Sequence, residues 1–88
     1  MAFKRVGDFH VYILKCVDGT YYTGYSPDLV KRVELHNKGR GAKYTKARRP
    51  VVLVWSKKFR YYKHAINAEL AVKRLNRKSK ERLIKRGG

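Results

Sequence analysis

One acidic residue of this chain occupies an unusual position for a carboxylate. The sequence holds 23 Lys and Arg residues against 6 Asp and Glu, and five of those acids suit a turn, a helix end, an exposed helical position or the start of the chain. Glu69 does not, because on a helix it falls among Ala65, Ile66 and Val72. A carboxylate there is unfavourable without a cationic partner. That partner is a divalent metal ion or an arginine, or else the ammonium group of Lys73 one turn later.

Arg32 and His36 form a second candidate group, since residues four apart on a helix lie on the same face. The planar guanidinium group of arginine suits a phosphate. A histidine can move or orient a proton near neutral pH. The same spacing also fits a histidine at the edge of the core beside a surface arginine, so the pair alone leaves both interpretations open.

Tyrosines form a third group, with seven in the chain and Tyr12, Tyr21, Tyr22 and Tyr25 crowded into one hairpin. Tyrosine favours strands, so packing explains most of them. A phenol can also donate a hydrogen bond to a phosphate oxygen. It can act as a base if nearby cations lower its pKa, and the strong local positive charge favours that.

The local residue patterns predict the elements that position these side chains. β-branched and aromatic runs predict strands, and a Ser-Pro-Asp start predicts a helix that stops before a glycine. A basic loop is expected over residues 38–50. The predicted strands are 10–17, 21–25 and 51–59, and the predicted helices run from the cap at 26–28 to about 37, from 63 to 75, and from 80 to 85 with Ser79 as its cap.

The register of the first hairpin decides whether Tyr12 and Tyr22 can act together. A two-residue loop at Asp18-Gly19 would place them on opposite faces, because side chains alternate with a period of two. A three-residue loop with Gly19 in the left-handed conformation pairs Cys16 with Tyr22 and places the two phenols on one face. We expect the second arrangement.

The charge balance indicates the kind of partner. A formal net charge of +17 in 88 residues calls for an anion, either nucleic acid or a membrane surface. The predicted helices are short and core-facing, and no apolar run approaches the roughly 18 residues of a membrane span, so we expect nucleic acid and no membrane association.

Length and cysteine content bound the organisation of the chain. Its 88 residues suit one domain. The single cysteine, Cys16, excludes an internal disulfide and a multi-cysteine zinc site and fits a reducing compartment. Residues 1–7 are too short and polar for a signal peptide. We therefore expect a cytoplasmic protein, or a nuclear one in a eukaryotic host, that is neither secreted nor membrane-bound.

Basic side chains gather in two segments, six in residues 38–50 and eight in residues 73–86. Long basic side chains with an aromatic ring among them suit a nucleic-acid backbone or a single strand. The candidate nucleic-acid contacts are Lys38, Arg40, Lys43, Tyr44, Lys46, Arg48, Arg49, Lys73 and Arg77.

Taken in order, these pieces resemble the GIY-YIG nuclease superfamily. Val11-Tyr12-Ile13 stands where that family has its first triplet and Tyr22-Thr23-Gly24 where it has the second. The arginine and histidine follow on the next helix, and Glu69 lies where the family has its metal-binding glutamate. The ordered set is specific, although valine replaces the first glycine and threonine an isoleucine. The stretch 39–45, Gly-Arg-Gly-Ala-Lys-Tyr-Thr, looks especially like the small stand-alone bacterial members.

The resemblance covers about residues 10–84 and implies an α+β fold, a three-stranded antiparallel sheet flanked by helices. It implies a metal-dependent endonuclease that uses Mg²⁺ (or Mn²⁺) and no small-molecule cofactor. Such an enzyme hydrolyses a DNA phosphodiester to a 5′-phosphate and a 3′-hydroxyl, with structure rather than sequence preference, in DNA repair or processing. The implied roles are a general base for Tyr12 assisted by His36, phosphate contacts for Arg32, Tyr22 and Tyr44, and metal binding for Glu69.

Two other functions fit parts of the sequence. A non-catalytic nucleic-acid-binding module would bind with a steep salt dependence and need no metal. A small RNA-associated protein of ribosomal character fits the charge but gives no reason for a glutamate on a packed helix face, and it would bind RNA more tightly than DNA.

Overall fold

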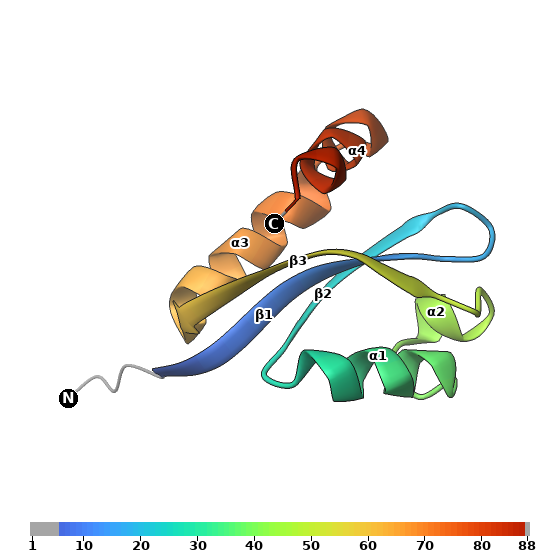
Figure 1. Cartoon of the computed structure of the whole chain (residues 1–88), viewed down its shortest axis with the longest axis horizontal. Helices are drawn as coiled ribbons and strands as arrows, with labels where there is room; N and C mark the ends of the chain where they lie inside the picture. The colour runs from blue at the N-terminus through green and yellow to red at the C-terminus, as the bar shows by residue number, and fades with distance from the viewer. Residues whose placement is uncertain (1–5, 88) are drawn as a thin grey trace.

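The computed structural model describes residues 6–87, which form a three-stranded antiparallel sheet with helices on both faces (Figure 1). This confirms the expected α+β class. The strand order is β2-β1-β3, so β1 is central. The expectation of no signal peptide concerns residues 1–7, and residues 1–5 of that segment lie outside the described residues. The elements are β1 (Val6–Lys15), β2 (Tyr21–Ser26), α1 (Leu29–Asn37), α2 (Lys43–Lys46), β3 (Val52–Tyr61), α3 (Tyr62–Arg74) and α4 (Arg77–Arg86).

The first hairpin has the expected loop length but begins one residue earlier than expected. The Cys16 amide donates to the Thr20 carbonyl at 2.8 Å, and the loop between them ends at Gly19, whose φ is 86°. The predicted pairing of Cys16 with Tyr22 is therefore wrong, and Tyr22 pairs with Leu14. The shift moves the partner by two positions, which preserves the face. Tyr12 and Tyr22 share one face, as expected.

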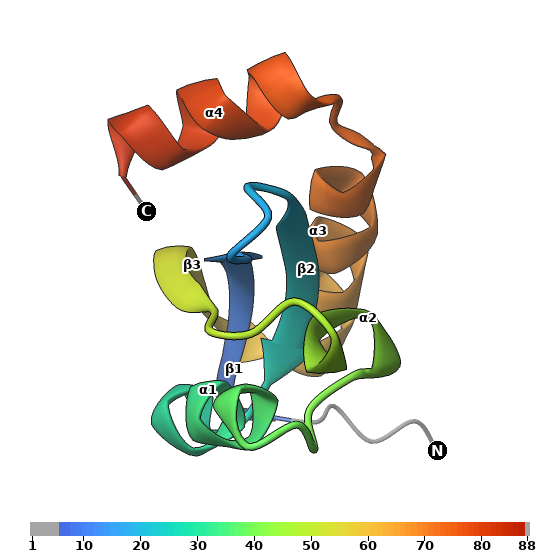
Figure 2. The same ribbon diagram turned by 90° about the vertical axis from the view of Figure 1, so that its right-hand side faces the viewer.

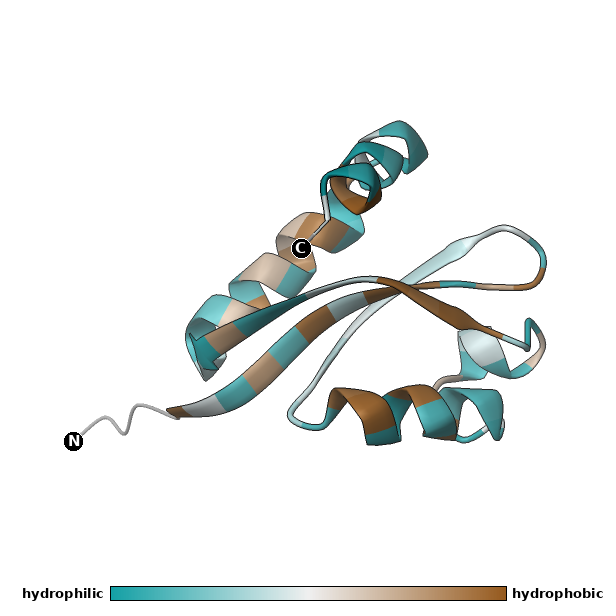
Figure 3. Ribbon diagram, in the orientation of Figure 1, coloured by the Kyte–Doolittle hydropathy of each residue, from teal (hydrophilic) through white to brown (hydrophobic). Residues whose placement is uncertain are grey.

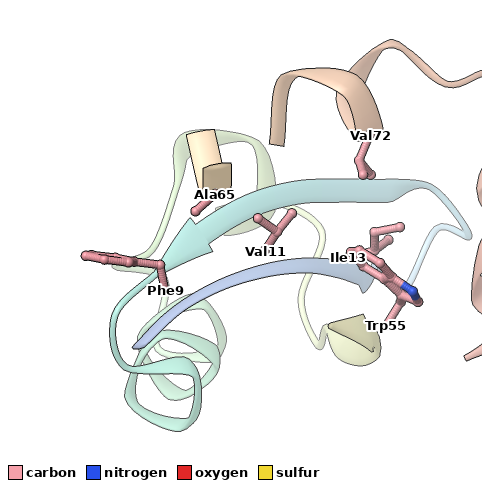
Figure 4. Close-up of a cluster of buried hydrophobic side chains, with 6 residues drawn as sticks. All are labelled: Phe9, Val11, Ile13, Trp55, Ala65 and Val72. Atoms are coloured by element: carbon pink, nitrogen blue, oxygen red, sulfur yellow. The ribbon is translucent and has the colours of Figure 1, made fainter. Parts of the chain in front are cut away.

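The central strand is buried on both sides, and its alternate side chains build two cores. One core is the cluster of Phe9, Val11, Ile13, Trp55, Ala65 and Val72 under α3 (Figure 4). We call this side of the sheet the α3 face. The other core contains Tyr12, Leu14, Cys16 and Val51, with Leu29 and Val33 of α1 against it. We call this side the α1 face. In Figure 3 the helices that cover the sheet carry both hydrophobic (brown) and hydrophilic (teal) residues.

Helix α1 begins later than the sequence predicts. Its N-cap is Asp28, whose carboxylate accepts the Lys31 amide at 3.1 Å, whereas Ser26 ends β2 and accepts the Asp28 amide. The helix ends at Asn37 as expected, with Gly39 at φ 79° directly after its C-cap. The predicted loop 38–50 contains one more helix, α2, of four residues. Its composition of Lys, Tyr and Thr carries no helical period, so the sequence gives no signal for it.

Helix α4 also differs in its cap. Asn76 accepts the Ser79 amide at 2.8 Å, so Asn76 rather than Ser79 caps the helix, which starts three residues before the predicted Lys80. Both residue types cap helices well, and the extended backbone of Leu75, with ψ 140°, selects the earlier position. The helix lies across the end of the sheet where β1 passes into β2 (Figure 2). Arg77 donates to the Gly19 carbonyl at 3.0 Å and fastens it there.

Candidate active site

The phenol of Tyr12 lies at the centre of the candidate site. Tyr12 is on the central strand, points to the α1 face and is 2 % exposed. Its partner across the ladder is Gly24 of β2. A Cβ atom on Gly24 would lie only 2.6 Å from the Tyr12 hydroxyl. The glycine of the second triplet therefore provides the space that the phenol occupies.

His36 contacts that phenol from helix α1. Its Nε2 atom lies 2.9 Å from the Tyr12 hydroxyl, and its Nδ1 atom lies 2.7 Å from the Thr45 hydroxyl. The imidazole is 1 % exposed, and its centroid is 5.2 Å from that of the Tyr22 ring. The histidine is therefore a buried, hydrogen-bonded group that joins α1 to the hairpin tyrosines.

The electrostatics of the pair differ from the sequence expectation. Burial raises the pKa of Tyr12, and the charges of Tyr22 and Glu69 raise it further, while Arg32 opposes them. The expected lowering of a tyrosine pKa by the surrounding cations is therefore wrong for Tyr12, because desolvation outweighs the nearby guanidinium. Burial, reinforced by Arg32, lowers the pKa of His36. The resting pair is a neutral phenol beside a neutral imidazole.

Arg32 and Glu69 both act on the Tyr12 phenol. Arg32 lies one turn before His36 and is half-buried, and its guanidinium forms no hydrogen bond or ion pair with any residue from 6 to 87. Its five donors are therefore available to an anion. Glu69 comes from α3, on the opposite side of the sheet, yet its charge reaches the phenol. The predicted guanidinium and acid thus shift the pKa of the predicted base in opposite directions, each from a helix on a different face of the sheet.

Glu69 is paired with Lys73, the other partner that the sequence allowed. The ammonium nitrogen lies 3.1 Å from Oε2, and the Glu69 side chain is only 15 % exposed while that of Lys73 is 49 % exposed. Among residues 6–87 no group of three or more His, Cys, Asp or Glu side chains gathers as a metal cage. Mg²⁺ is commonly held by one or two carboxylates, several waters and substrate phosphates, so a lone, largely buried carboxylate fits that ion.

A groove runs from the tyrosines of β2 and α2 to Lys73 of α3. It has a volume of about 250 Å³. Tyr21 and Tyr22 point to opposite faces of β2, an edge strand, so a groove lined by both runs over the exposed edge of the sheet. Lys80 of α4 was not among the predicted contacts, although it stands in the basic run 73–86. The groove is lined by Tyr21, Tyr22, Tyr44, Lys73 and Lys80, among others.

The predicted nucleic-acid contacts divide into engaged and free side chains. Arg48 bonds to Asp18 and the Tyr44 carbonyl, and its guanidinium lies 3.9 Å from the Tyr44 ring centre. Arg49 donates to the carbonyls of Lys46 and Asn37, and Arg77 holds α4 to the hairpin. These three arginines therefore have structural partners. Among the predicted contacts, four lysine and arginine side chains form no hydrogen bond or ion pair with the described residues: those of Lys38, Arg40, Lys43 and Lys46.

Tyr44 completes the wall of the groove. Its ring stacks on that of Tyr22, with centroids 6.0 Å apart and an interplanar angle of 25°, and the residue is 38 % exposed.

None of the helices in the described part of the chain has the length and hydropathy needed to span a bilayer.

This arrangement of tyrosines, arginine, histidine and glutamate around a three-stranded sheet defines a GIY-YIG type of domain. The model of the GIY-YIG catalytic domain matches residues 8–82, and the chain belongs to the GIY-YIG family. A UPF0213 protein of Pediococcus pentosaceus is 46% identical over 88 residues, covering 100% of this chain and 93% of the relative. A UPF0213 protein of Staphylococcus aureus is 52% identical over 75 residues, covering 85% and 92% respectively.

Two solution NMR structures have the same fold. One is a UPF0213 protein of Bacillus halodurans, 44% identical, with a TM-score of 0.59 and coverage of 89% of this chain and 83% of that one. The other is a protein of E. faecalis, 38% identical, with a TM-score of 0.62 and coverage of 94% and 88%. The names of these relatives state no activity, so the family places the chain among nuclease-type domains without specifying its reaction.

Proposed function

We propose that this chain is a metal-dependent endonuclease that hydrolyses a DNA phosphodiester to a 5′-phosphate and a 3′-hydroxyl. It would select DNA structure rather than sequence and act in DNA repair or processing. One observation carries the proposal. The buried Tyr12 phenol is hydrogen-bonded to His36 and lies in the fields of both Arg32 and Glu69. A buried phenol needs a hydrogen-bond partner in any case, and a neutral imidazole as that partner can also take up the phenol's proton.

In this proposal Tyr12 and His36 act together as the base. The Tyr12 oxygen accepts a proton from the attacking water while its own proton passes to His36 Nε2, 2.9 Å away. The phenol therefore never has to exist as a free phenolate, which its raised pKa would oppose. His36, kept neutral by burial and Arg32, is a ready acceptor.

Arg32 and Tyr22 hold the scissile phosphate. The guanidinium group has no competing partner among residues 6–87 and presents a planar fork that matches phosphate oxygens. Donors aimed at the charge that develops on the phosphoryl oxygens stabilise the transition state. Tyr44, stacked on Tyr22, is a further contact to the phosphate.

Glu69 is the residue that would hold Mg²⁺ or Mn²⁺. When bound, such an ion stabilises the negative charge on the leaving oxygen. The Lys73 ammonium group now forms an ion pair with this carboxylate, so the lysine side chain has to move before the ion can bind. Lys73 lines the groove together with Lys80, where its ammonium group can pair with a DNA phosphate instead.

The experiment is a cleavage panel on flapped, branched, single-stranded and duplex DNA with and without Mg²⁺ or Mn²⁺. Glu69→Gln keeps the size of the side chain and removes its charge, and we expect it to abolish cleavage while DNA binding survives. Glu34→Gln is the matched control, because Glu34 is an exposed acid on α1 that forms no ion pair with the described residues. It should cut as the wild type does.

The outcomes separate the candidate functions. Metal-dependent cleavage that Glu69→Gln abolishes supports the proposal. A folded wild-type protein that binds DNA with a steep salt dependence but cuts no form of it is a non-catalytic binding module. Tighter binding to RNA than to any of the DNA forms, without cleavage, points to an RNA-associated protein.

A further inference from the structure

We propose that Thr45 is a positioning residue that fixes the tautomer of His36, so that Nε2 presents its lone pair to the Tyr12 hydroxyl. This inference rests on the proposed function. Thr45 lies on α2, in the stretch 39–45, and its side chain is completely buried. The reaction proposed above gives Tyr44 of that stretch a contact to the phosphate but leaves Thr45 without a role.

The proton count at His36 identifies the tautomer. Three contacts run in series: Tyr12 Oη to His36 Nε2 at 2.9 Å, His36 Nδ1 to Thr45 Oγ1 at 2.7 Å, and Thr45 Oγ1 to the Ala42 carbonyl at 3.1 Å. A carbonyl oxygen only accepts, so the last contact uses the single proton of the threonine hydroxyl. Thr45 Oγ1 must then accept from His36, which places the proton of the neutral imidazole on Nδ1.

The other tautomer satisfies fewer groups. With the proton on Nε2, the histidine would donate to Tyr12, and Thr45 would have to donate to Nδ1. The threonine oxygen would then face the Ala42 carbonyl without a proton between them, and the Tyr12 proton would have no acceptor among the described residues. Buried polar groups left unpaired are costly. The series of hydrogen bonds therefore selects the tautomer that can receive the Tyr12 proton.

The surrounding chain holds the imidazole in this position. Gly41 lies against the ring so closely that a Cβ there would be 2.3 Å from Nδ1 and 2.4 Å from Cγ. Arg49 donates to a carbonyl at the end of α1 and to one at the end of α2, which fastens the two helices to each other. Gly41 therefore supplies space for the ring while Thr45 supplies the acceptor. Both are needed because a ring that rotates would lose the alignment of Nε2 with the phenol.

The test compares Thr45→Val, which removes the hydroxyl at nearly constant shape, with Thr45→Ser, which keeps it. Nitrogen-15 NMR of labelled histidine reports which ring nitrogen carries the proton, and it needs no catalytic activity. We expect a pyridine-like Nε2 for His36 in the wild type and in Thr45→Ser. In Thr45→Val we expect a mixture of tautomers or the Nε2–H form, with cleavage roughly 10- to 100-fold slower and DNA affinity unchanged.

Thr23→Val is the matched control for the spectrum and for stability. Thr23 is another buried threonine, and its hydroxyl has no hydrogen-bond partner among the described residues, so this variant should leave the His36 signals in place. A wild-type spectrum with the proton on Nε2 overturns the inference, as does a Thr45→Val protein with the wild-type tautomer and rate. If Thr45→Val does not fold, the wild-type and Thr45→Ser spectra still decide. If the wild-type protein carries the His36 proton on Nδ1 but cuts no DNA, the proposed nuclease function is refuted and the inference about the tautomer is not.

Discussion

A methyl group added at Gly24 tests whether the position of the Tyr12 phenol controls cleavage. The φ of Gly24 lies outside the left-handed region, so alanine meets no backbone strain there. The obstacle is space, because the new Cβ would lie 2.6 Å from the Tyr12 oxygen, 2.8 Å from its Cζ and 3.2 Å from Tyr22 Cε2. Ordinary contact begins at 3.4 Å, so the phenol oxygen has to retreat by the difference, about 0.8 Å.

That retreat affects both stability and the reaction. Tyr12 is buried, so its displacement forces neighbouring groups to move, and overpacking of this kind costs about 1–3 kcal/mol of unfolding free energy. The hydrogen bond to His36 is 2.9 Å long, and a shift of most of an ångström takes it out of its normal range. A misplacement of that size at a reacting group can slow a reaction roughly 100-fold. We therefore expect Gly24→Ala to fold with a lower unfolding free energy and to cut DNA roughly 100-fold more slowly.

Urea denaturation gives the unfolding free energy of this variant, and single-turnover cleavage at saturating protein gives its rate. Gly7→Ala is the matched control, since Gly7 is also a strand glycine and its Cβ would lie 3.5 Å from the Phe9 ring, an ordinary contact. We expect this control to stay within about 0.5 kcal/mol and twofold of the wild type. A folded Gly24→Ala protein that cuts DNA at the wild-type rate would refute the role given to the Tyr12 phenol.

Three further predictions follow from the charges of the site. Lys73→Met removes the partner of Glu69 in a half-exposed ion pair that contributes up to about 1 kcal/mol. Calorimetry should therefore show an affinity for Mn²⁺ that is raised by up to about 5-fold. An unchanged affinity would count against Glu69 as the metal ligand. Arg32→Lys keeps the charge but loses the planar fork, so cleavage should fall on the order of 100-fold with little change in the salt dependence of binding; a wild-type rate would contradict the phosphate role. Because the folded pKa of His36 lies below its ordinary value of 6.5, the unfolded chain takes up the proton first, so the unfolding free energy should fall as pH drops below about 6.5. Urea titrations at several pH values should lose this slope in His36→Gln, and an equal slope in both proteins would assign it elsewhere.

Much of the fold follows from local patterns along the chain. The alternation of apolar residues in β1, the Asp-Gly turn and the left-handed Gly19 place Tyr12 and Tyr22 on one face, even though the register is shifted by two partner positions. The four-residue spacing puts Arg32 and His36 on one side of α1. These features depend on backbone sterics and on the period of each element, which neighbouring residues are enough to specify.

The chemistry of the site depends on distant residues and could not be read in the same way. Glu69 sits on the packed side of its helix, as its neighbours indicate, but only the folded sheet shows that its charge reaches Tyr12 and that Lys73 occupies its carboxylate. The direction of the Tyr12 pKa shift likewise results from burial. The many cations of the chain would by themselves lower this pKa, but desolvation of the buried phenol raises it by more.

Composition and periodicity predicted the strands and the basic character of the chain, and left two registers open for the first hairpin. The resemblance to the GIY-YIG family, rather than spacing alone, singled out the side chains for phosphodiester chemistry. The tertiary structure decided which of these atoms meet, including the hydrogen-bonded series from Tyr12 through His36 to Thr45. The reason is physical. Strand and helix periods are short-range properties of the backbone, whereas a hydrogen bond between residues 24 positions apart and the burial of its donor exist only once the sheet and its helices have packed together.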